Sequence, residues 1–335
     1  MIRRILLYNS GGGIGDSIQL FPLILSLKNL FRDSEFYYLG AHDNHYLGKL
    51  KEYNIEINTL NLGLKYFGFR WWHLFFVKKK FLELGLDKFD LIVDCQSKLR
   101  NTIILKQIPA KAFYSHTFNN MFCSGFYLNT KKVISNFFGV HKIFYSLKFL
   151  LGLNSDSKII DYDIKNISKK YHDESKRLLP NKNYIGFSLT QGNVYRKKEW
   201  PLDNVIKLAE ELVKKNKIPV FLIEKKHHQL KDKIKNSIPL AVFPEHETSI
   251  SCPALVTCLG NRLDFAVTID NGIMHMLALS KIPMISLFGP TDPKKFAPIY
   301  KNSIILDSKK IYNSKNIANI TVEDVLRVAK QFSNF

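Results

Sequence analysis

A glycine-rich turn near the start of the chain ends in a carboxylate. An apolar run at residues 5–8 is followed by four glycines within residues 11–15 and then by Asp16. The turn is not a dinucleotide-binding fingerprint, since Asp16 stands where the third glycine is required. A carboxylate here either caps the following helix or acts as a general base on a hydroxyl of a substrate. Both interpretations of Asp16 stay open, and the glycines let a substrate approach the backbone closely.

A second polar group follows an apolar run in the C-terminal half. Residues 265–269 predict a buried strand, and Asp270, Asn271, Gly272 and His275 come directly after it. Ligands of open α/β sheets bind at the carboxyl ends of strands, and the N–H groups at a helix N-terminus suit a diphosphate. We expect Asp270 to be the N-cap of a helix over about residues 272–281. The alternative is that Asp270 only caps this helix and that His275 packs in a core.

A basic loop precedes the helix that starts at residue 202. Residues 196–198 are consecutive cations, and Lys198 is the last of them. Cations placed there can neutralise the charge that grows on a departing diphosphate. The alternative is a solvated basic loop, although Trp200 and the proline after it indicate a fixed loop shape.

A single glutamate follows another apolar run. Glu224 comes directly after residues 219–223, which predict a strand. A carboxylate at the carboxyl end of such a strand often binds ribose hydroxyls. A solvated surface residue is the alternative for Glu224.

Strand patterns and helix patterns alternate along both halves of the chain. This alternation predicts the fold class α/β, with parallel and doubly wound sheets. Helical spacing of apolar residues predicts one helix over residues 17–29. The strands are predicted at residues 5–8, 36–40, 90–94, 184–188, 219–223, 265–269 and 283–288.

The 335 residues are enough for two domains of about 150 residues each. Residues 154–183 are polar and weakly periodic, so we place the boundary there and expect domains at 1–165 and 166–320. Residues 321–335 are expected to form a C-terminal helix, because Thr321 followed by Asp324 resembles a capping box.

Four motifs occur in a fixed order along the chain and together resemble a known family. The order and spacing from residue 5 to about residue 298 are similar to those of glycosyltransferase family 9, the heptosyltransferase family of lipopolysaccharide core assembly. A further stretch at residues 90–96, followed by Arg100, looks like the D-x-Q stretch of that family. The four motifs are Gly15-Asp16 with Pro22, Lys198-Glu199-Trp200-Pro201, Asp270-Asn271-Gly272-Ile273-Met274-His275 and Phe288-Gly289-Pro290-Thr291.

The resemblance implies a GT-B fold, in which two Rossmann-like, doubly wound domains face a cleft. It implies an enzyme that binds the acceptor in its N-terminal domain and a nucleotide-sugar donor in its C-terminal domain. It also implies transfer with inversion and without a metal or other cofactor. The expected reaction moves heptose from ADP-heptose to a lipopolysaccharide-core or related glycolipid acceptor. A catalytically silent family member that binds nucleotide-sugar or lipid is the alternative.

The resemblance also implies a role for each matching residue. On the acceptor side, Asp16 is the expected base, Gly15 lines the site, and Arg100 contacts an anionic acceptor. The remaining matches lie on the donor side. Lys198 and the Gly272 backbone with His275 are expected at the diphosphate, Glu224 at the ribose, Asp270 at the transferred sugar, and Asn271 in the same pocket.

Two departures from the family pattern fall in the donor pocket. Asn271 stands where the family usually has threonine. Residues 190–193 replace the small residues that commonly follow the preceding strand. Both changes bear on which sugar and which nucleotide the pocket accepts.

Composition limits the partners and the compartment. The formal charge is +20, from 49 Lys and Arg against 29 Asp and Glu, which favours anionic partners. Nucleic acid is an alternative partner, but no common reading module is present, so we expect none. The four cysteines form no CxxC pair, and no apolar run is long enough to span a bilayer. The cysteine usage therefore indicates a cytoplasmic protein, and the family resemblance implies a peripheral position on the inner face of the bacterial inner membrane.

One aromatic and basic segment favours a membrane surface. It runs from Phe67 to Lys80 and combines tryptophans and phenylalanines with a run of lysines. Such a segment is typical of an interfacial anchor on anionic lipid. The alternative is a core helix with a solvated end. The histidines and cysteines elsewhere lack the spacing of zinc ligands, so no metal site is expected.

Overall fold

The computed structural model describes residues 2–40, 43–64, 69–129, 139–153, 156–190 and 194–332. The chain divides into two compact units, Met1–Tyr162 and Asp163–Phe335. The division lies three residues before the expected boundary at 165/166. The helix expected as a separate C-terminal element, α13 (Val322–Ala329), belongs to the second unit, where it packs on α7 (Leu202–Val213) and β9 (Met284–Phe288).

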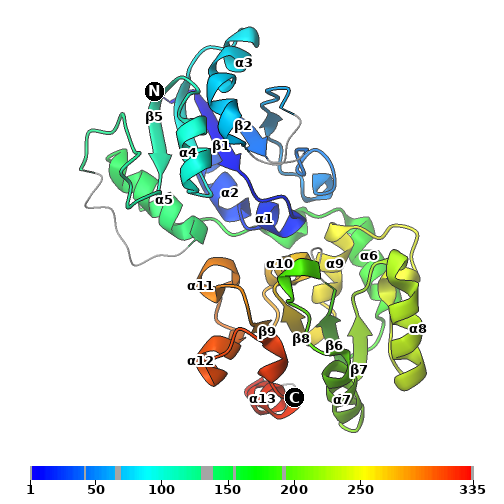
Figure 1. Ribbon diagram of the computed structural model, residues 1–335. Coiled ribbons are helices and arrows are strands. Elements are labelled where there is room, and N and C mark those ends of the chain that lie inside the picture. Colours follow the sequence, from blue (N-terminus) through cyan, green and yellow to red (C-terminus); the bar gives the residue numbers. More distant parts are fainter. Residues whose placement is uncertain are drawn as a thin grey trace. The chain divides into compact units, whose positions relative to one another are not determined.

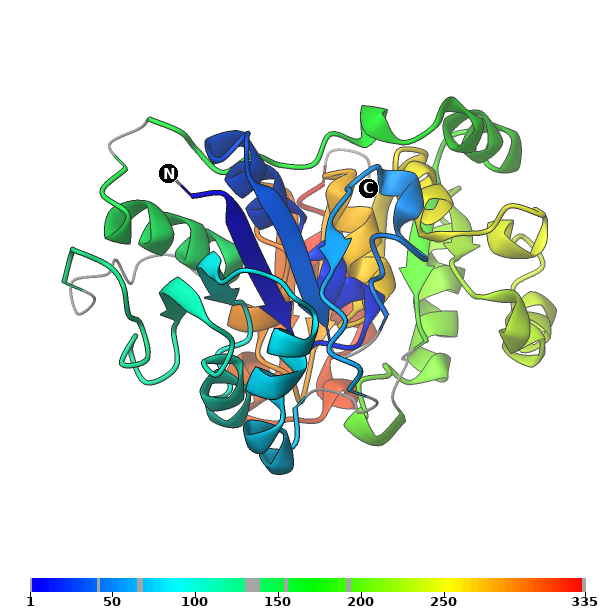
Figure 2. The same cartoon turned by 90° about the horizontal axis from the view of Figure 1, so that it is seen from above.

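The N-terminal unit is built on a five-stranded parallel sheet in the order β3-β2-β1-β4-β5. Figure 2 shows β1 and β2 side by side. The central strand β1 is buried on both faces, as expected for a parallel sheet covered on both sides. The strands are β1 (Arg4–Asn9), β2 (Glu35–Gly40), β3 (Asn58–Thr59), β4 (Phe89–Asp94) and β5 (Ala110–Ser115).

Helices cover this sheet and bury alternating residues of β1. Leu6 and Tyr8 pack in one cluster with Val77, Phe81 and Ile104. The elements outside the sheet include two 3-10 turns, η1 (Lys51–Tyr53) and η2 (Trp71–Phe75). The helices are α1 (Ile14–Ile18), α2 (Phe21–Leu30), α3 (Val77–Glu83), α4 (Leu99–Leu105) and α5 (Gly139–Leu150).

The single helix predicted over residues 17–29 is wrong, because the chain forms α1 and α2 instead. Pro22 lies in the first turn of α2. Proline is well suited to that position, since it lacks the N–H that the first turn leaves unpaired. The periodic pattern therefore hid a break that the proline marks.

The C-terminal unit has a second five-stranded parallel sheet in the order β10-β9-β8-β6-β7. Figure 1 shows its strands in green to red. Every residue of β6 and of β9 is buried, in agreement with the continuous apolar runs that predicted them. The strands not yet located are β6 (Tyr184–Ser188), β7 (Ile218–Phe221), β8 (Leu263–Ile269) and β10 (Ser303–Asp307).

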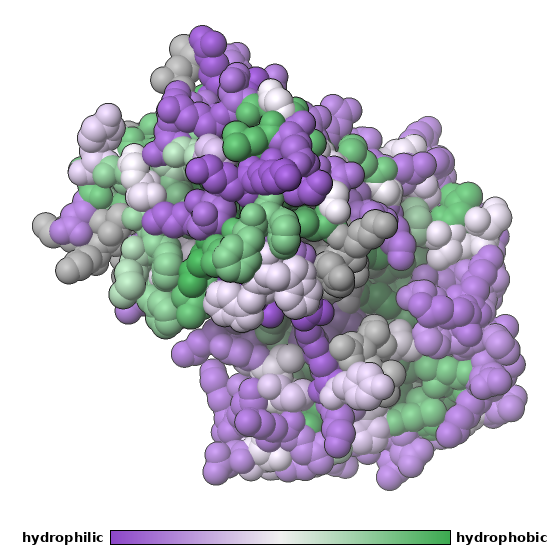
Figure 3. Space-filling model, turned by 45° about the horizontal axis from the view of Figure 1, so that its top comes forward, coloured by the Kyte–Doolittle hydropathy of each residue, from purple (hydrophilic) through white to green (hydrophobic). Residues whose placement is uncertain are grey.

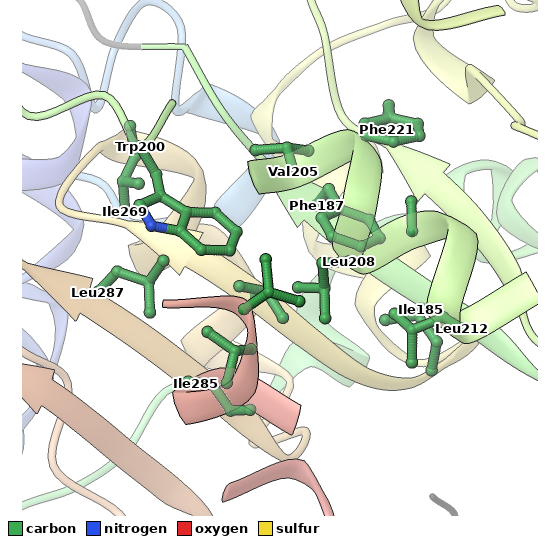
Figure 4. Close-up of a cluster of buried hydrophobic side chains, with 14 of the residues drawn as sticks. Ile185, Phe187, Trp200, Val205, Leu208, Leu212, Phe221, Ile269, Ile285 and Leu287 are labelled. Atoms are coloured by element: carbon green, nitrogen blue, oxygen red, sulfur yellow. The ribbon is translucent and has the colours of Figure 1, made fainter. Parts of the chain in front are cut away.

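Amphipathic helices close this second core. Helix α7 buries Val205, Leu208, Ala209 and Leu212, which share one helical face. Figure 4 shows part of this face against Phe187 and Phe221. The other helices are α6 (Lys169–Leu178), α8 (His228–Ser237), α9 (Pro253–Gly260), α10 (Gly272–Leu279), α11 (Pro293–Phe296) and α12 (Ser308–Tyr312).

Helix α13 begins at the predicted capping box. The Thr321 hydroxyl accepts the N–H of Asp324 at 3.1 Å, and the Asp324 carboxylate accepts the N–H of Thr321 at 3.1 Å. This reciprocal pair confirms the pattern read from the sequence.

Each sheet has a switch point, which is the place between two neighbouring strands from which the chain continues to one side after the first strand and to the other side after the second. In the N-terminal unit it lies between β1 and β4, and in the C-terminal unit between β6 and β8. Ligands of open α/β sheets bind at the carboxyl ends of strands beside such a point. The predicted site residues follow β1 and β4 in one unit and β8 in the other, with Lys198 in the loop after β6 and Glu224 after β7.

The surface that Figure 3 displays is mainly hydrophilic. Figure 3 shows hydrophilic residues over most of one face, with hydrophobic residues reaching it in several places. None of the helices in the described part of the chain has the length and apolarity that crossing a bilayer requires.

Candidate active site

The glycine turn after β1 holds the Asp16 carboxylate against its own backbone. Asp16 is the third residue of α1, and its Oδ2 accepts the N–H of Gly13 at 3.1 Å. A Cβ atom on Gly11 would lie 2.4 Å from Asp16 Cγ. Glycine at position 11 is therefore what allows the carboxylate to fold over the turn. Gly15, in the first turn of α1, is buried.

Asp16 thus caps α1, but this contact uses only one of its oxygens. Within the described residues, no Lys, Arg or His side chain forms an ion pair with the Asp16 carboxylate, and Oδ1 has no hydrogen-bond donor. Asp16 is half-buried. An unpaired carboxylate oxygen at a partly open position is able to accept a proton from a substrate hydroxyl. Capping and general-base chemistry are compatible in this geometry.

Asn9 connects the glycine turn to the neighbouring strand β4. Its side-chain oxygen accepts the N–H of Gly11 at 2.9 Å and the Nε2 of Gln96 at 2.6 Å. Its Nδ2 donates to the carbonyl of Asp16 at 3.3 Å. Sequence reasoning did not single out Asn9, although a polar residue at the end of a buried strand is the signal that could have shown it.

The D-x-Q stretch at the end of β4 holds Gln96, which contacts Asn9, in place. Asp94 is fully buried, and its Oδ1 accepts the N–H groups of Gln96 at 3.1 Å and Ser97 at 2.9 Å. Its Oδ2 accepts the hydroxyls of Thr102 at 2.5 Å and Ser115 at 2.9 Å. Burial raises the pKa of Asp94, and these hydrogen bonds oppose the rise. Asp94 therefore positions Gln96, and through it Asn9 and the glycine turn.

Arg100 lies in the first turn of α4, close to the end of β1. Burial raises the pKa of Tyr8, and the nearby Arg100 charge opposes that rise. Burial also lowers the pKa of His73, and the charges of Arg70 and Arg100 lower it further. In the described part of the chain, no carboxylate pairs with Arg100, and its buried Nε has no hydrogen-bond acceptor. The guanidinium therefore keeps binding capacity for an anionic group.

The centre of the C-terminal site is an ion pair between Lys198 and Asp270. Lys198 Nζ lies 2.5 Å from Asp270 Oδ2 and donates to the Asp270 carbonyl at 3.1 Å. Both side chains are nearly buried, at 11% and 6% exposure. Lys198 Nζ also lies 5.9 Å from the centre of the Phe296 ring. Breaking such a pair by removing one partner typically costs about 3–5 kcal/mol.

The loop that carries Lys198 is fixed by its neighbours. Trp200 is buried in the core, and its indole N–H donates to the carbonyl of Ile320 at 2.8 Å. Figure 4 shows the ring beside Ile269 and Leu287. Lys197 has a left-handed backbone with φ of 47°. Trp200 thus anchors the end of this loop on the core of the unit.

The prediction that Asp270 is the N-cap of α10 is wrong, because Asn271 has this role. Asn271 Oδ1 accepts the N–H of Met274 at 3.0 Å, and α10 starts at Gly272. Asp270 instead turns its carboxylate to Lys198. The alternative in which Asp270 only caps the helix is therefore also wrong.

The amide of Asn271 makes bonds that a threonine at this position cannot make together. Its Nδ2 donates to the Ser188 hydroxyl at 2.5 Å and to the Thr190 carbonyl at 2.9 Å, while Oδ1 caps α10. A hydroxyl has only one hydrogen to donate. The departure at position 271 therefore ties the end of β6 to the start of α10. Of the second departure, at residues 190–193, only Thr190 lies within the described residues.

Helix α10 begins two residues after Asp270. The first N–H groups of a helix have no partner inside the helix, and the N-terminus carries positive partial charge. Gly272 is the first residue of α10, and His275, the fourth, is buried. Lys198 and this helix end therefore place two sources of positive potential beside Asp270.

Glu224 follows a different strand from Asp270, at the same carboxyl-terminal edge of the sheet. It follows β7, is exposed, and pairs with Lys226 at 2.6 Å. Strand β7 is separated from β8 by β6 alone, and neighbouring strands lie about 4.8 Å apart, so the two strand ends are about 10 Å apart. Glu224 thus shares an edge with Asp270 but does not contact it in the described contacts.

A buried carboxyl next to Glu224 was missed by sequence reasoning. Glu245 is 5% exposed, and its Oε2 accepts the hydroxyl of Ser251 at 3.0 Å. Burial raises the pKa of Glu245, and the charge of Glu224 raises it further. No periodic or motif signal in the sequence marks this residue.

The fourth family motif lies at the end of β9 and in the loop after it. Lys309 Nζ holds this loop by donating to the carbonyls of Pro290 and Thr291 at 3.0 Å each. Among the described residues, no three His, Cys, Asp or Glu side chains gather closely enough to hold a metal ion.

Two Rossmann-like units with parallel sheets, each carrying charged residues at its switch point, define the GT-B fold class. Solved structures agree with this class. A glycosyltransferase family 9 structure from Veillonella parvula is 17% identical with a TM-score of 0.69, and the alignment covers 98% of this chain and 97% of that one. The Escherichia coli heptosyltransferase WaaC with ADP is 14% identical with a TM-score of 0.65, over 98% and 97% of the two chains.

The sequence comparison gives the family itself. The model of glycosyltransferase family 9 (heptosyltransferase) matches residues 78–325. The chain belongs to glycosyltransferase family 9. Lipooligosaccharide heptosyltransferase 2 of Haemophilus influenzae is 28% identical over 117 residues, and the match spans 32% of this chain and 32% of that relative. The predicted family, enzyme class and fold class are confirmed, whereas the roles of individual residues remain predictions.

Proposed function

We propose that this chain transfers heptose from ADP-heptose to a lipopolysaccharide-core or related glycolipid acceptor, with inversion and without a metal ion. The observation that carries the proposal is the Lys198–Asp270 pair beside the N-terminus of α10, at the switch point of the C-terminal sheet. The substrates are supported by relatives, which include heptosyltransferases solved with ADP and with ADP-2-deoxy-2-fluoro heptose.

The C-terminal unit has what a donor diphosphate needs. The Lys198 ammonium and the amides at the start of α10 supply positive potential at one place. We assign the diphosphate to Lys198, Gly272 and His275, and the transferred sugar to Asp270. Glu224, which follows β7, is assigned to the ribose. Asn271 shapes this pocket by joining α10 to the end of β6.

The N-terminal unit has what an acceptor hydroxyl needs. In the proposed step, the acceptor oxygen attacks the anomeric carbon while the bond from that carbon to the phosphate oxygen breaks. Asp16 takes the hydroxyl proton, and ADP leaves with the bonding electrons. A single displacement of this kind inverts the anomeric carbon. Gly15 lines the approach, and the unpaired Arg100 guanidinium binds an anionic group of the acceptor.

The groups available to stabilise the leaving group support the proposal of metal-free transfer. A departing ADP gains negative charge, which cationic and amide donors placed in advance can stabilise. Lys198 and the α10 N-terminus have this arrangement in the chain's own residues. Since the acceptor class is lipid-linked, we place the reaction at the cytoplasmic face of the inner membrane.

The test is a transfer assay with purified chain, ADP-heptose and a heptose-free core acceptor. We expect ADP release that depends on acceptor, a product of inverted anomeric configuration by NMR, and full activity in the presence of EDTA. Loss of activity in EDTA that magnesium restores would contradict the metal-free step. ADP-heptose that binds without any turnover would instead indicate a silent family member.

A further inference from the structure

One surface of the N-terminal unit exposes an unusual set of large apolar side chains. Phe75 is 77% exposed, Trp71 53% and Trp72 50%. They belong to η2, and helix α3, which is cyan in Figure 1, follows directly. We define the η2–α3 patch by its six exposed apolar residues, which are Trp71, Trp72, Phe75, Phe76, Leu82 and Leu84.

These side chains are not part of the core that holds the segment in place. His73, Val77 and Phe81 recur every four residues and are buried, and Val77 and Phe81 pack in the core cluster under the sheet. The inward face of the segment therefore fixes it to the unit. The outward residues are apolar and exposed, and exposed apolar patches of this kind mark interaction sites.

Exposed cations lie on both sides of the aromatic residues in the sequence. Arg70, Lys78, Lys79 and Lys80 are all exposed, and Glu83 is the one acidic residue between positions 70 and 84. Lys80 pairs with Glu83 at 2.9 Å. Tryptophan and phenylalanine beside lysines are the side chains that lie at the boundary between acyl chains and anionic headgroups.

We propose that the η2–α3 patch docks the chain on an anionic lipid bilayer, with the rings at the acyl boundary and the lysines on the headgroups. A second copy of the chain fits less well, because two copies of this patch would bring like charges together. Two exposed leucines also favour acyl chains over nucleic-acid bases, which bind aromatic and cationic surfaces. Under the proposed function, this docking would hold the enzyme where a lipid-linked acceptor is concentrated.

The test measures sedimentation with sucrose-loaded vesicles of phosphatidylcholine, alone or mixed with phosphatidylglycerol. We expect strong binding only to the anionic vesicles, and weaker binding as salt is raised. Each lysine near an anionic surface strengthens binding about fivefold. K78E/K79E should therefore weaken binding at least about 25-fold, and W71S/F75S should abolish it.

Matched variants in the C-terminal unit control for charge and apolarity. K214E/K215E makes the same charge change at exposed lysines of that unit, and I299S removes a residue that is 69% exposed. Both should bind like the parent, and far-UV circular dichroism should show all four variants folded. Equal weakening by K78E/K79E and K214E/K215E, or unchanged binding of W71S/F75S, would overturn the proposal.

A water-soluble acceptor fragment separates this proposal from the proposed function. The patch variants should turn over such a fragment at the parental rate, since they leave the candidate active site intact. If K78E/K79E loses that turnover as well, the patch binds the acceptor itself and the docking proposal fails. If light scattering shows that W71S/F75S converts a dimer into a monomer, a second copy covers the patch and the proposal fails too.

Discussion

The two units each place an aspartate at the switch point of a parallel sheet, but in different electrostatic surroundings. Asp16 is half-buried and accepts one backbone N–H, with no cation paired to it among the described residues. Asp270 is almost fully buried and lies 2.5 Å from the Lys198 ammonium. The same sheet topology therefore supports one carboxylate with an oxygen left for a substrate and one that is paired with a cation.

The difference follows from what surrounds each strand end. After β1, glycines bring the backbone against Asp16, and Asn9 and Gln96 hold that turn with neutral amides. After β8, a loop anchored by Trp200 brings a lysine against Asp270. Neutral support on one side and a cation on the other are what the proposed acceptor and donor roles require.

The largest expected effect comes from removing the charge of Asp16. Asp16→Asn keeps the side-chain shape and, through its amide oxygen, the cap on Gly13. We expect kcat to fall about 10²–10⁴-fold, the usual contribution of general acid–base catalysis. The dissociation constant of ADP should be unchanged, and calorimetric titration measures it. Near-parental turnover of this variant would remove Asp16 as the base.

The second-largest effect is expected on stability, when Lys198 in the C-terminal unit is replaced. Lys198→Met leaves Asp270 buried without its cation, so we expect the free energy of unfolding to fall by about 3 kcal/mol and ADP to bind more weakly. Adding Asp270→Asn should restore most of the stability but not the ADP affinity. Urea denaturation and ADP titration of both variants measure this. If Lys198→Met alone is as stable as the parent, the ion pair contributes little to the free energy of unfolding.

Two neighbouring glycines test how closely Asp16 is held. Gly11→Ala places a Cβ atom 2.4 Å from Asp16 Cγ, whereas Gly13→Ala places one 3.3 Å from Asp16 Oδ2. The first must displace the carboxylate, and a small misplacement costs about 10²-fold in rate. The second requires a shift of only a few tenths of an ångström and should cost far less. Turnover rates of the two variants decide, and equal losses would contradict the assigned geometry.

The smallest effect concerns the buried carboxyl beside Glu224. Burial raises the pKa of Glu245, so between the usual glutamate pKa and the raised value the folded state binds more protons than the unfolded state. Stability of the parent therefore falls as pH rises through that window. Glu245→Gln removes this loss, so its stability relative to the parent should increase with pH. Urea denaturation at several pH values measures the trend, and a relative stability that declines with pH would be inconsistent with a raised pKa.

The sequence was sufficient for the features that repeat along the chain. Continuous apolar runs located the central strands, and alternation with helices gave the α/β class. Thr321 and Asp324 gave the start of α13 because the contact is local. The periodic pattern predicted one helix where the chain forms two, α1 and α2, because the break between them is marked by one residue, Pro22 in the first turn of α2.

The site was predictable as a set of residues but not as a set of contacts. Lys198 and Asp270 are 72 positions apart, and their pairing depends on where Trp200 anchors a loop. That pairing draws Asp270 away from the cap, which Asn271 then supplies. Asn9 and Glu245 were missed because they belong to no motif. The importance of Asn9 appears in its hydrogen bonds, and that of Glu245 in its burial.

The most direct test of the central claim is a crystal structure with an unreactive ADP-sugar and an acceptor. The account predicts diphosphate oxygens about 3 Å from both Lys198 Nζ and the Gly272 N–H. It also predicts the acceptor hydroxyl within hydrogen-bond distance of an Asp16 oxygen. A diphosphate bound away from α10, or an acceptor hydroxyl that contacts a different base, would contradict it.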